Sequence, residues 1–200
     1  AMVGGRGTQP PSSYNRAYSD RFLIPAGSAI KPITVYLPAI DTKFATAATV
    51  YEDSRFRNQI KAAYPSNYVA KNSPDKYEGY MTLREALKYS KNTITQKLSF
   101  DEGIDLGLAY ADKLDIYFSP DDRTGYVPVS LGEFRGTNTY KMAAAYGIFG
   151  NHGLYTEPVM YTKVIDKTGK VILEASPSQK TVASPEASYI LYDMLKGPIR

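Results

Sequence analysis

The 200-residue sequence contains no cysteine, no tryptophan and a single histidine, His152. The absence of cysteine excludes disulfides, thiolate metal sites and a cysteine nucleophile, although it does not choose a cellular compartment. No apolar run reaches the roughly 18 residues that span a bilayer, and no signal-peptide pattern is present. Metal-ligating side chains do not cluster in groups of three or more along the sequence. We therefore expect neither a metal nor a cofactor.

What is present is the composition of an ordinary globular chain, 43% hydrophobic and 22% charged. The net charge of +4 is too small and too dispersed for a nucleic-acid-binding surface. The 18 tyrosines are scattered without a basic stripe beside them, so we expect them in the core and at its rim. At about 150 residues per domain, the length predicts one domain or slightly more.

The two ends of the sequence fit poorly with a complete domain. The apolar residues 1–3 run directly into glycines, and residues 195–200 hold a helix stop followed by almost nothing. A natural domain end is usually a frayed polar segment. We therefore expect a fragment cut at both ends.

Hydrophobic periodicity predicts an α+β chain, with a helical part over about 28–150 and strand fragments near both ends. Pro38 is expected to bend or end the first helix, and Thr82 with Glu85 forms a capping box for the second. Residues 41–80 are predicted to be irregular. The predicted helices cover 28–40, 82–89, a segment that follows Asn92, 104–114, 139–149 and 184–197, and the predicted strands cover 159–165 and 170–173.

Ser28 and Lys31 are separated by three positions, so they share one helix face at its first turn. A serine hydroxyl becomes a good nucleophile when a neighbouring base takes its proton. A buried lysine is such a base, because burial penalises its ammonium form. The same spacing occurs in Ser73 and Lys76, where a Pro-Asp turn predicts solvated surface. On spacing alone, an ordinary helix N-cap is the better explanation of Ser28.

Ser90 and Asn92 lie at the junction of two predicted helices. A hydroxyl there can relay a proton, and a side-chain amide can hold a substrate amide or the lysine. The alternative is that Ser90 ends one helix and Asn92 caps the next. A similar spacing in Ser13 and Asn15 shows that the motif is weak by itself. Its occurrence after Ser28 and Lys31, in helical context, makes the catalytic interpretation stronger.

Several longer segments resemble the transpeptidase domain of class A (bifunctional) penicillin-binding proteins, in order and over nearly the whole chain. The resemblance implies a penicillin-binding transpeptidase or serine β-lactamase-like fold, in which a helical subdomain packs on an antiparallel sheet. Residues 1–200 would then be an incomplete domain that lacks the first and last sheet strands. The segments that carry the resemblance are an early strand ending in Gly-Gly-Arg at 1–6, Asn-Arg-Ala at 15–17, the region around Ser28 and Lys31, Leu-Arg-Glu-Ala-Leu at 83–87 with Ser-Lys-Asn at 90–92, and 142–153.

The resemblance implies a role for each of four residues. Ser28 would be the acyl-accepting nucleophile and Lys31 its base. Ser90 would shuttle a proton to the leaving amine, and Asn92 would anchor the substrate and the lysine. The implied reaction is transfer of a peptidoglycan stem peptide ending in D-alanyl-D-alanine, and β-lactams would acylate the same serine.

The family's third motif, Lys-Thr-Gly on a strand beside the nucleophile, has only a doubtful counterpart. Lys167, Thr168 and Gly169 have the right letters but follow Asp166 between two predicted strands, which is the chemistry of a hairpin turn. We therefore expect the true motif beyond Arg200, and we expect the chain alone to be inactive.

Other functions remain as alternatives: a serine β-lactamase, a D,D-carboxypeptidase, or a catalytically silent cell-wall-binding domain. A Ser-His-Asp triad would have to use His152, which we expect to be a loop residue. The partners implied are stem peptides, β-lactams and a companion chain carrying the missing strands, with no nucleic acid. The resemblance implies a location outside the cytoplasm, at the bacterial cell membrane and cell-wall face. The protein would contact the membrane only through a missing N-terminal anchor.

Overall fold

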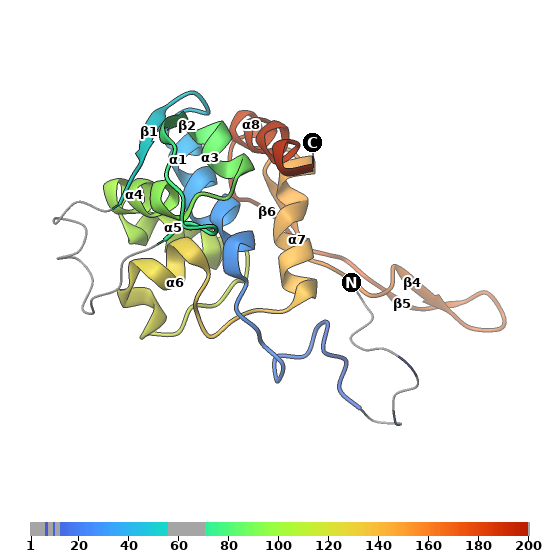
Figure 1. Ribbon diagram of the computed structural model, residues 1–200. Helices are drawn as coiled ribbons and strands as arrows, with labels where there is room; N and C mark the ends of the chain where they lie inside the picture. Colours follow the sequence, from blue (N-terminus) through green and yellow to red (C-terminus); the bar gives the residue numbers. More distant parts are fainter. Residues whose placement is uncertain (1–6, 8–9, 11–12, 56–70, 200) are drawn as a thin grey trace.

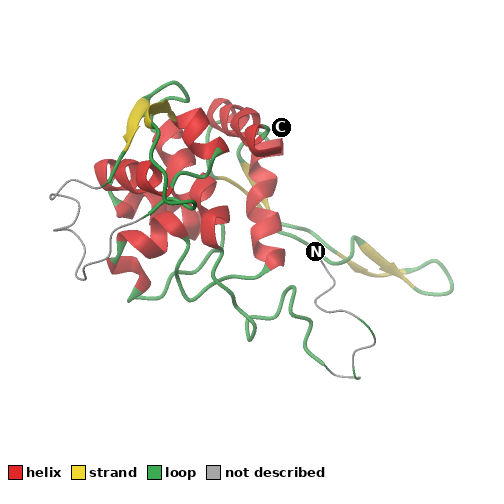
Figure 2. Cartoon of the chain, in the orientation of Figure 1, coloured by secondary structure: helices red, strands yellow, loops and turns green. Residues whose placement is uncertain are grey.

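The computed structural model describes residues 7, 10, 13–55 and 71–199. The early strand expected at 1–6 lies outside these residues. Within them, the chain mixes helices with short antiparallel strand pairs, which confirms the predicted α+β class (Figures 1 and 2).

The predicted helix over 28–40 is a continuous helical segment with three geometries. A 3₁₀ turn, η1 (Gly27–Ile30), leads into a wide π turn, η2 (Pro32–Tyr36), and then into the α-helix α1 (Leu37–Asp41). Every residue of η2 is buried. Helices α4 (Asn92–Glu102), α5 (Ile104–Lys113) and α6 (Tyr126–Leu131) pack around η2. This segment is therefore the centre of the helical body (Figure 1).

Pro38 does not end the helix, which continues to Asp41. A proline ring normally collides with the carbonyl four residues earlier, here that of Thr34. That carbonyl instead lies against Gly107 of α5, where an added Cβ would come within 2.3 Å of Thr34 O. The wide π turn and the small residue opposite it thus accommodate the proline.

The remaining predicted helices are confirmed, with shifts at their ends. Thr82 and Glu85 form the predicted capping box, which begins the helix over Leu83–Lys88. The short helical elements α6 and η3 (Asp122–Thr124) were not predicted, because neither is long enough to show a period and no side-chain cap marks its start. The other helical elements are α3 (Leu83–Lys88), α7 (Thr139–Gly150), α8 (Pro185–Leu195) and η4 (Gly197–Ile199).

The expectation that 41–80 is irregular holds for most of its described residues, and 56–70 lie outside them. It missed strands β1 (Val50–Asp53) and β2 (Gly79–Thr82), which pair within or at the edge of this stretch. These four-residue strands lack the alternation that would have revealed them. The predicted hairpin is confirmed as β4 (Lys163–Ile165) and β5 (Val171–Glu174). A further pair, β3 (Leu154–Thr156) and β6 (Gln179–Thr181), was also missed and carries this hairpin away from the body (Figure 1).

Candidate active site

Ser28 lies at the start of η1, immediately after Gly27, and its side chain is exposed. Gly27 has a φ of 56°, a left-handed conformation that glycine adopts without strain. The Lys31 backbone N–H donates to Ser28 O, which closes the 3₁₀ turn. Among the described residues, Ser28 Oγ makes no hydrogen bond, so the hydroxyl is open to a reactant.

Lys31, in contrast, is only 1% exposed. Its ammonium donates to Ser90 O at 2.9 Å, to Ser90 Oγ at 3.0 Å and to Asn92 Oδ1 at 2.6 Å. These three acceptors match the three N–H bonds of an ammonium. The structure therefore brings together three of the four residues singled out from the sequence, across 59 and 61 positions of chain.

Burial lowers the pKa of Lys31 to about 7, because desolvation disfavours the ammonium form. A large fraction of the lysine is then neutral near neutral pH. The neutral amine has a lone pair, and the Ser90 hydroxyl can donate to it instead of accepting from it. The same contacts thus hold the lysine in either protonation state.

Ser90 occupies the turn between α3 and α4 with a φ of 51°, an uncommon value for a serine. Its N–H donates to Leu87 O and that of Lys91 donates to Ala86 O, so the turn closes the C-terminus of α3. The reversal directs both the carbonyl and the hydroxyl of Ser90 to Lys31. The alternative interpretation, in which Ser90 ends one helix and Asn92 caps the next, is therefore correct for Ser90, which lies at the end of α3.

Asn92 is the first residue of α4 rather than its cap. Its side-chain amide is oriented from both sides, since Nδ2 donates to Lys71 O at 2.6 Å and Oδ1 accepts from Lys31. No motif pointed to Lys71, which precedes the second Ser-x-x-Lys match. In that match, Ser73 and Lys76 are exposed, as predicted.

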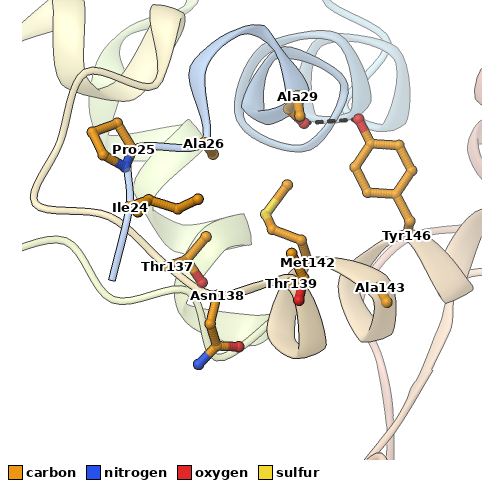
Figure 3. Close-up of a pocket in the computed structure, with 10 residues that line it drawn as sticks. All are labelled: Ile24, Pro25, Ala26, Ala29, Thr137, Asn138, Thr139, Met142, Ala143 and Tyr146. Carbon is orange, nitrogen blue, oxygen red and sulfur yellow. Dashed lines mark hydrogen bonds between the residues drawn. The ribbon is translucent and has the colours of Figure 1, made fainter. Parts of the chain in front are cut away.

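The turn that carries Ser28 is fixed to two other elements. The Gly27 N–H donates to Gly132 O at 3.2 Å, at the end of α6. On the other side, the Tyr146 hydroxyl on α7 donates to Ala29 O at 2.7 Å (Figure 3). Burial raises the pKa of Tyr146 to about 12, so this donor keeps its proton. Sequence reasoning missed both contacts.

A mainly apolar cavity of about 350 Å³ lies beside this turn (Figure 3). Its walls come from the chain before Ser28 and from the start of α7. Because the cavity reaches Ala29, it adjoins the candidate nucleophile. Its lining consists of Ile24, Pro25, Ala26, Ala29, Thr137, Asn138, Thr139, Met142, Ala143 and Tyr146.

The other sequence candidates lie elsewhere. Lys167, Thr168 and Gly169 form the turn between β4 and β5, where Asp166 accepts from the Thr168 and Lys170 N–H groups. The hairpin-turn interpretation is thus confirmed. His152 is exposed in the turn after α7, as expected. Within the described ranges, no cluster of three or more acidic, histidine or cysteine side chains could hold a metal ion.

Comparison with known proteins identifies the family of this chain. Residues 1–198 match the family described as the penicillin binding protein transpeptidase domain. In this fold, the helical body buries Lys31 against Ser90 and Asn92 and leaves Ser28 exposed. The chain belongs to the penicillin-binding protein transpeptidase family.

The chain is 51% identical to penicillin-binding protein 1A of Clostridium acetobutylicum, over 100% of the chain and 25% of the relative. It is 53% identical to the Clostridium botulinum protein of the same name, over 99% of the chain and 24% of the relative. The chain therefore spans about a quarter of the length of these curated relatives.

Solved structures show the same fold. Penicillin-binding protein 1A from Haemophilus influenzae superimposes with a TM-score of 0.76 at 28% identity, over 92% of this chain and 31% of the other. Penicillin-binding protein A from Mycobacterium tuberculosis, as an imipenem acyl-enzyme complex, also gives a TM-score of 0.76, at 21% identity over 92% of this chain and 45% of the other.

Across the described part of the chain, we find no helix with the length and apolar character of a membrane span.

Proposed function

We propose that this chain forms part of a serine D,D-transpeptidase of peptidoglycan synthesis. The observation that carries the proposal is the buried Lys31, which contacts Ser90 and Asn92 one helical turn from the exposed Ser28. The exposed Ser28 thus lies three residues before a lysine whose pKa of about 7 suits proton transfer at neutral pH.

In the first half of the reaction, neutral Lys31 takes the proton of Ser28, and Ser28 Oγ attacks the carbonyl carbon of the penultimate D-alanine. The peptide C–N bond then breaks. The leaving D-alanine amine takes a proton relayed through Ser90, and the stem peptide remains as an ester on Ser28. Asn92 holds the substrate amide and the lysine.

In the second half, the amino group of another stem peptide attacks the ester carbonyl. The new peptide bond forms as the Ser28 ester breaks, and the proton lost by the amine returns to Ser28 through Lys31. A β-lactam enters the same path, but its ring nitrogen stays attached to the acyl group after the ring opens.

We propose further that residues 1–200 are an incomplete domain. Lys167, Thr168 and Gly169 form a hairpin turn, so the described residues supply no Lys-Thr-Gly strand beside Ser28. A companion chain or adjoining sequence would supply it. The proposed reaction on peptidoglycan implies a location outside the cytoplasm at the cell-wall face, with any membrane anchor upstream of this chain.

The test is acylation by a fluorescent penicillin, followed by intact mass and by peptide mapping of the adduct. We expect a long-lived adduct on Ser28 in the protein at its full natural length and none in Ser28→Ala. We expect the 200 residues alone to react much more slowly. An adduct released within minutes would favour a β-lactamase. D-Alanine release without cross-linking would favour a carboxypeptidase, and an unchanged Ser28→Ala adduct would refute the site.

A further inference from the structure

The loop that presents Ser90 and Asn92 is backed by a buried polar cluster from three separate parts of the chain. At its centre is Asp53, the last residue of β1, which is 1% exposed. One carboxylate oxygen accepts from Asn72 Nδ2 at 2.6 Å and from the Thr93 hydroxyl. The other accepts from the Glu78 N–H at 3.1 Å and pairs with Lys91 Nζ at 2.9 Å.

Asn72 connects this carboxylate to the start of α4. Its Oδ1 accepts from the Asn92 N–H at 3.0 Å and from the Thr93 N–H at 3.3 Å. The residue at the N-cap position of α4, Lys91, makes no capping side-chain bond. Asn72 therefore satisfies N–H groups that would otherwise lack a partner, and it caps α4 from outside the helix.

Lys91, between Ser90 and Asn92, is held by the same cluster. Its ammonium pairs with Asp53 and with Glu78, each at 2.9 Å. Burial alone would lower the pKa of Lys91, but the two carboxylates raise it overall, so the ammonium persists. Burial likewise opposes ionisation of Asp53, yet hydrogen bonds from Thr93, Lys91 and Asn72 lower its pKa overall. The cluster is thus a buried ion pair between Asp53 and Lys91, in which hydrogen bonds satisfy the remaining carboxylate lone pairs.

The Asn92 end of the loop that presents Ser90 and Asn92 is fixed by these contacts. The backbone of Asn92 is held by Asn72, and its side-chain amide by the adjacent Lys71 carbonyl. Because Asn92 Oδ1 lies 2.6 Å from Lys31 Nζ, a displacement of α4 moves an acceptor of the proposed base. None of Asp53, Asn72 and Thr93 contacts Lys31 directly among the described hydrogen bonds.

We propose that Asp53 and Asn72 are positioning residues for the reaction: they hold Asn92 and Ser90 at the geometry that Lys31 requires. This inference rests on the proposed function of Ser28 and Lys31. A misplacement of about 1 Å in a catalytic constellation can cost about 100-fold in rate.

The experiment measures the rate constant of penicillin acylation per folded molecule, in the protein at its full natural length. We expect Asp53→Asn and Asn72→Ala each to lower it about 10- to 100-fold. Asn72→Asp should be worse, because it places a second carboxylate against Asp53. The double variant D53N/N72D restores one carboxylate and one amide across the pair, and we expect it to react at least about fivefold faster than Asn72→Asp.

Asp41→Asn is the matched control. Asp41 also joins distant elements, since it accepts from the Ser184 N–H at 2.9 Å, the Ser184 hydroxyl at 2.6 Å and the Tyr110 hydroxyl. It contacts neither Lys31 nor the loop among these bonds. We expect it to lower the melting temperature while the acylation rate per folded molecule stays within twofold.

Three outcomes separate the possibilities. If the unaltered protein forms no Ser28 adduct, the proposed function fails. If it does, but Asp53→Asn and Asn72→Ala react within twofold of it, the positioning role is refuted. Equal losses in the Asp41→Asn control, or no recovery in the double variant, would also refute it, because the effect would then follow general stability.

Discussion

Lys31 shows how one buried side chain acquires a function that its type does not have in water. An exposed lysine is charged at neutral pH and has no lone pair. Burial brings its pKa to about 7, and Ser90 and Asn92 supply the hydrogen bonds that solvent would otherwise provide. Burial thereby gives Lys31 the pKa that its proposed role as a base requires.

We expect the acylation rate constant to depend on the protonation of Lys31. Below about pH 7 the ammonium dominates, so the rate should rise about tenfold per pH unit and level off above that pKa. Rapid-mixing measurements with a chromogenic β-lactam from pH 5 to 9 check this. Lys31→Arg, whose guanidinium stays charged, should be inactive throughout. A flat profile would exclude Lys31 as the base.

Glu102, the last residue of α4, is a second strongly shifted group. Its carboxyl oxygens are buried, and no hydrogen-bond partner for them lies in the described part of the chain. Burial raises its pKa to about 9, with Asp101 adding to the shift. Between about pH 4.5 and 9, the folded state therefore keeps a proton that the unfolded state has already lost. The free energy of unfolding falls as pH rises through that window.

Glu102→Gln removes this titration. At pH 8 we expect the variant to melt more than about 3 °C above the unaltered protein, whereas at pH 4 the two should agree closely. Calorimetry at both pH values measures the difference. Glu133→Gln, at an exposed carboxylate, should change neither melting temperature. An equal effect of Glu102→Gln at both pH values would contradict the titration argument.

At the scale of elements, the turn carrying Ser28 depends on close backbone contact. Gly132 ends α6 with a φ of 76°, and an added Cβ would lie 2.2 Å from Gly27 O. The contact lets the Gly27 N–H reach Gly132 O. A side chain at Gly132 would push η1 and α6 apart, whereas a Cβ at Gly27 would meet no atom within 4 Å.

Gly132→Ala should therefore both destabilise the protein and slow acylation. Gly169→Ala is the control, because Gly169 has a similar φ of 88° but no atom within 4 Å of its Cβ position. We expect both variants to lose about 1 kcal/mol from backbone strain. Only Gly132→Ala should lose more, with at least a tenfold slower Ser28 adduct. Equal behaviour of the two would show that the contact does not hold the nucleophile.

At the scale of the whole molecule, the β4–β5 hairpin stands apart from the helical body (Figure 1). Its apolar side chains are exposed, including Ile165 and Ile172 at 58% each. A two-stranded hairpin is marginally stable by itself, and exposed apolar residues favour association. The body, in contrast, buries its apolar residues around η2 and α1.

Replacing Ile165 and Ile172 together by threonine should leave the melting temperature within about 2 °C, since neither residue packs in the core. It should also reduce self-association at high protein concentration, measured by light scattering. Leu191→Thr, at a buried position of α8, should instead cost about 2–5 kcal/mol. A large loss of stability in the hairpin variant would show that the hairpin packs on the body.

Much of the local structure was predictable because it depends on neighbouring residues. The capping box of Thr82 and Glu85 and the hairpin turn after Asp166 both appear as expected, and α4 begins one residue earlier than expected. Strands β1 and β2 were missed because each has four residues without alternating burial. Their strand character comes from pairing with each other, across segments that are distant in sequence.

The sequence by itself determined which residues could do chemistry and in what order: Ser28, Lys31, Ser90 and Asn92, with helix starts and turns around them. These signals act over three or four positions, through caps, turns and spacing. Only the tertiary structure decided that Lys31 is buried against Ser90 and Asn92, and that Asn72 caps α4 from 20 residues away. Burial and external capping depend on which distant segments meet, and a pKa depends on the water they exclude.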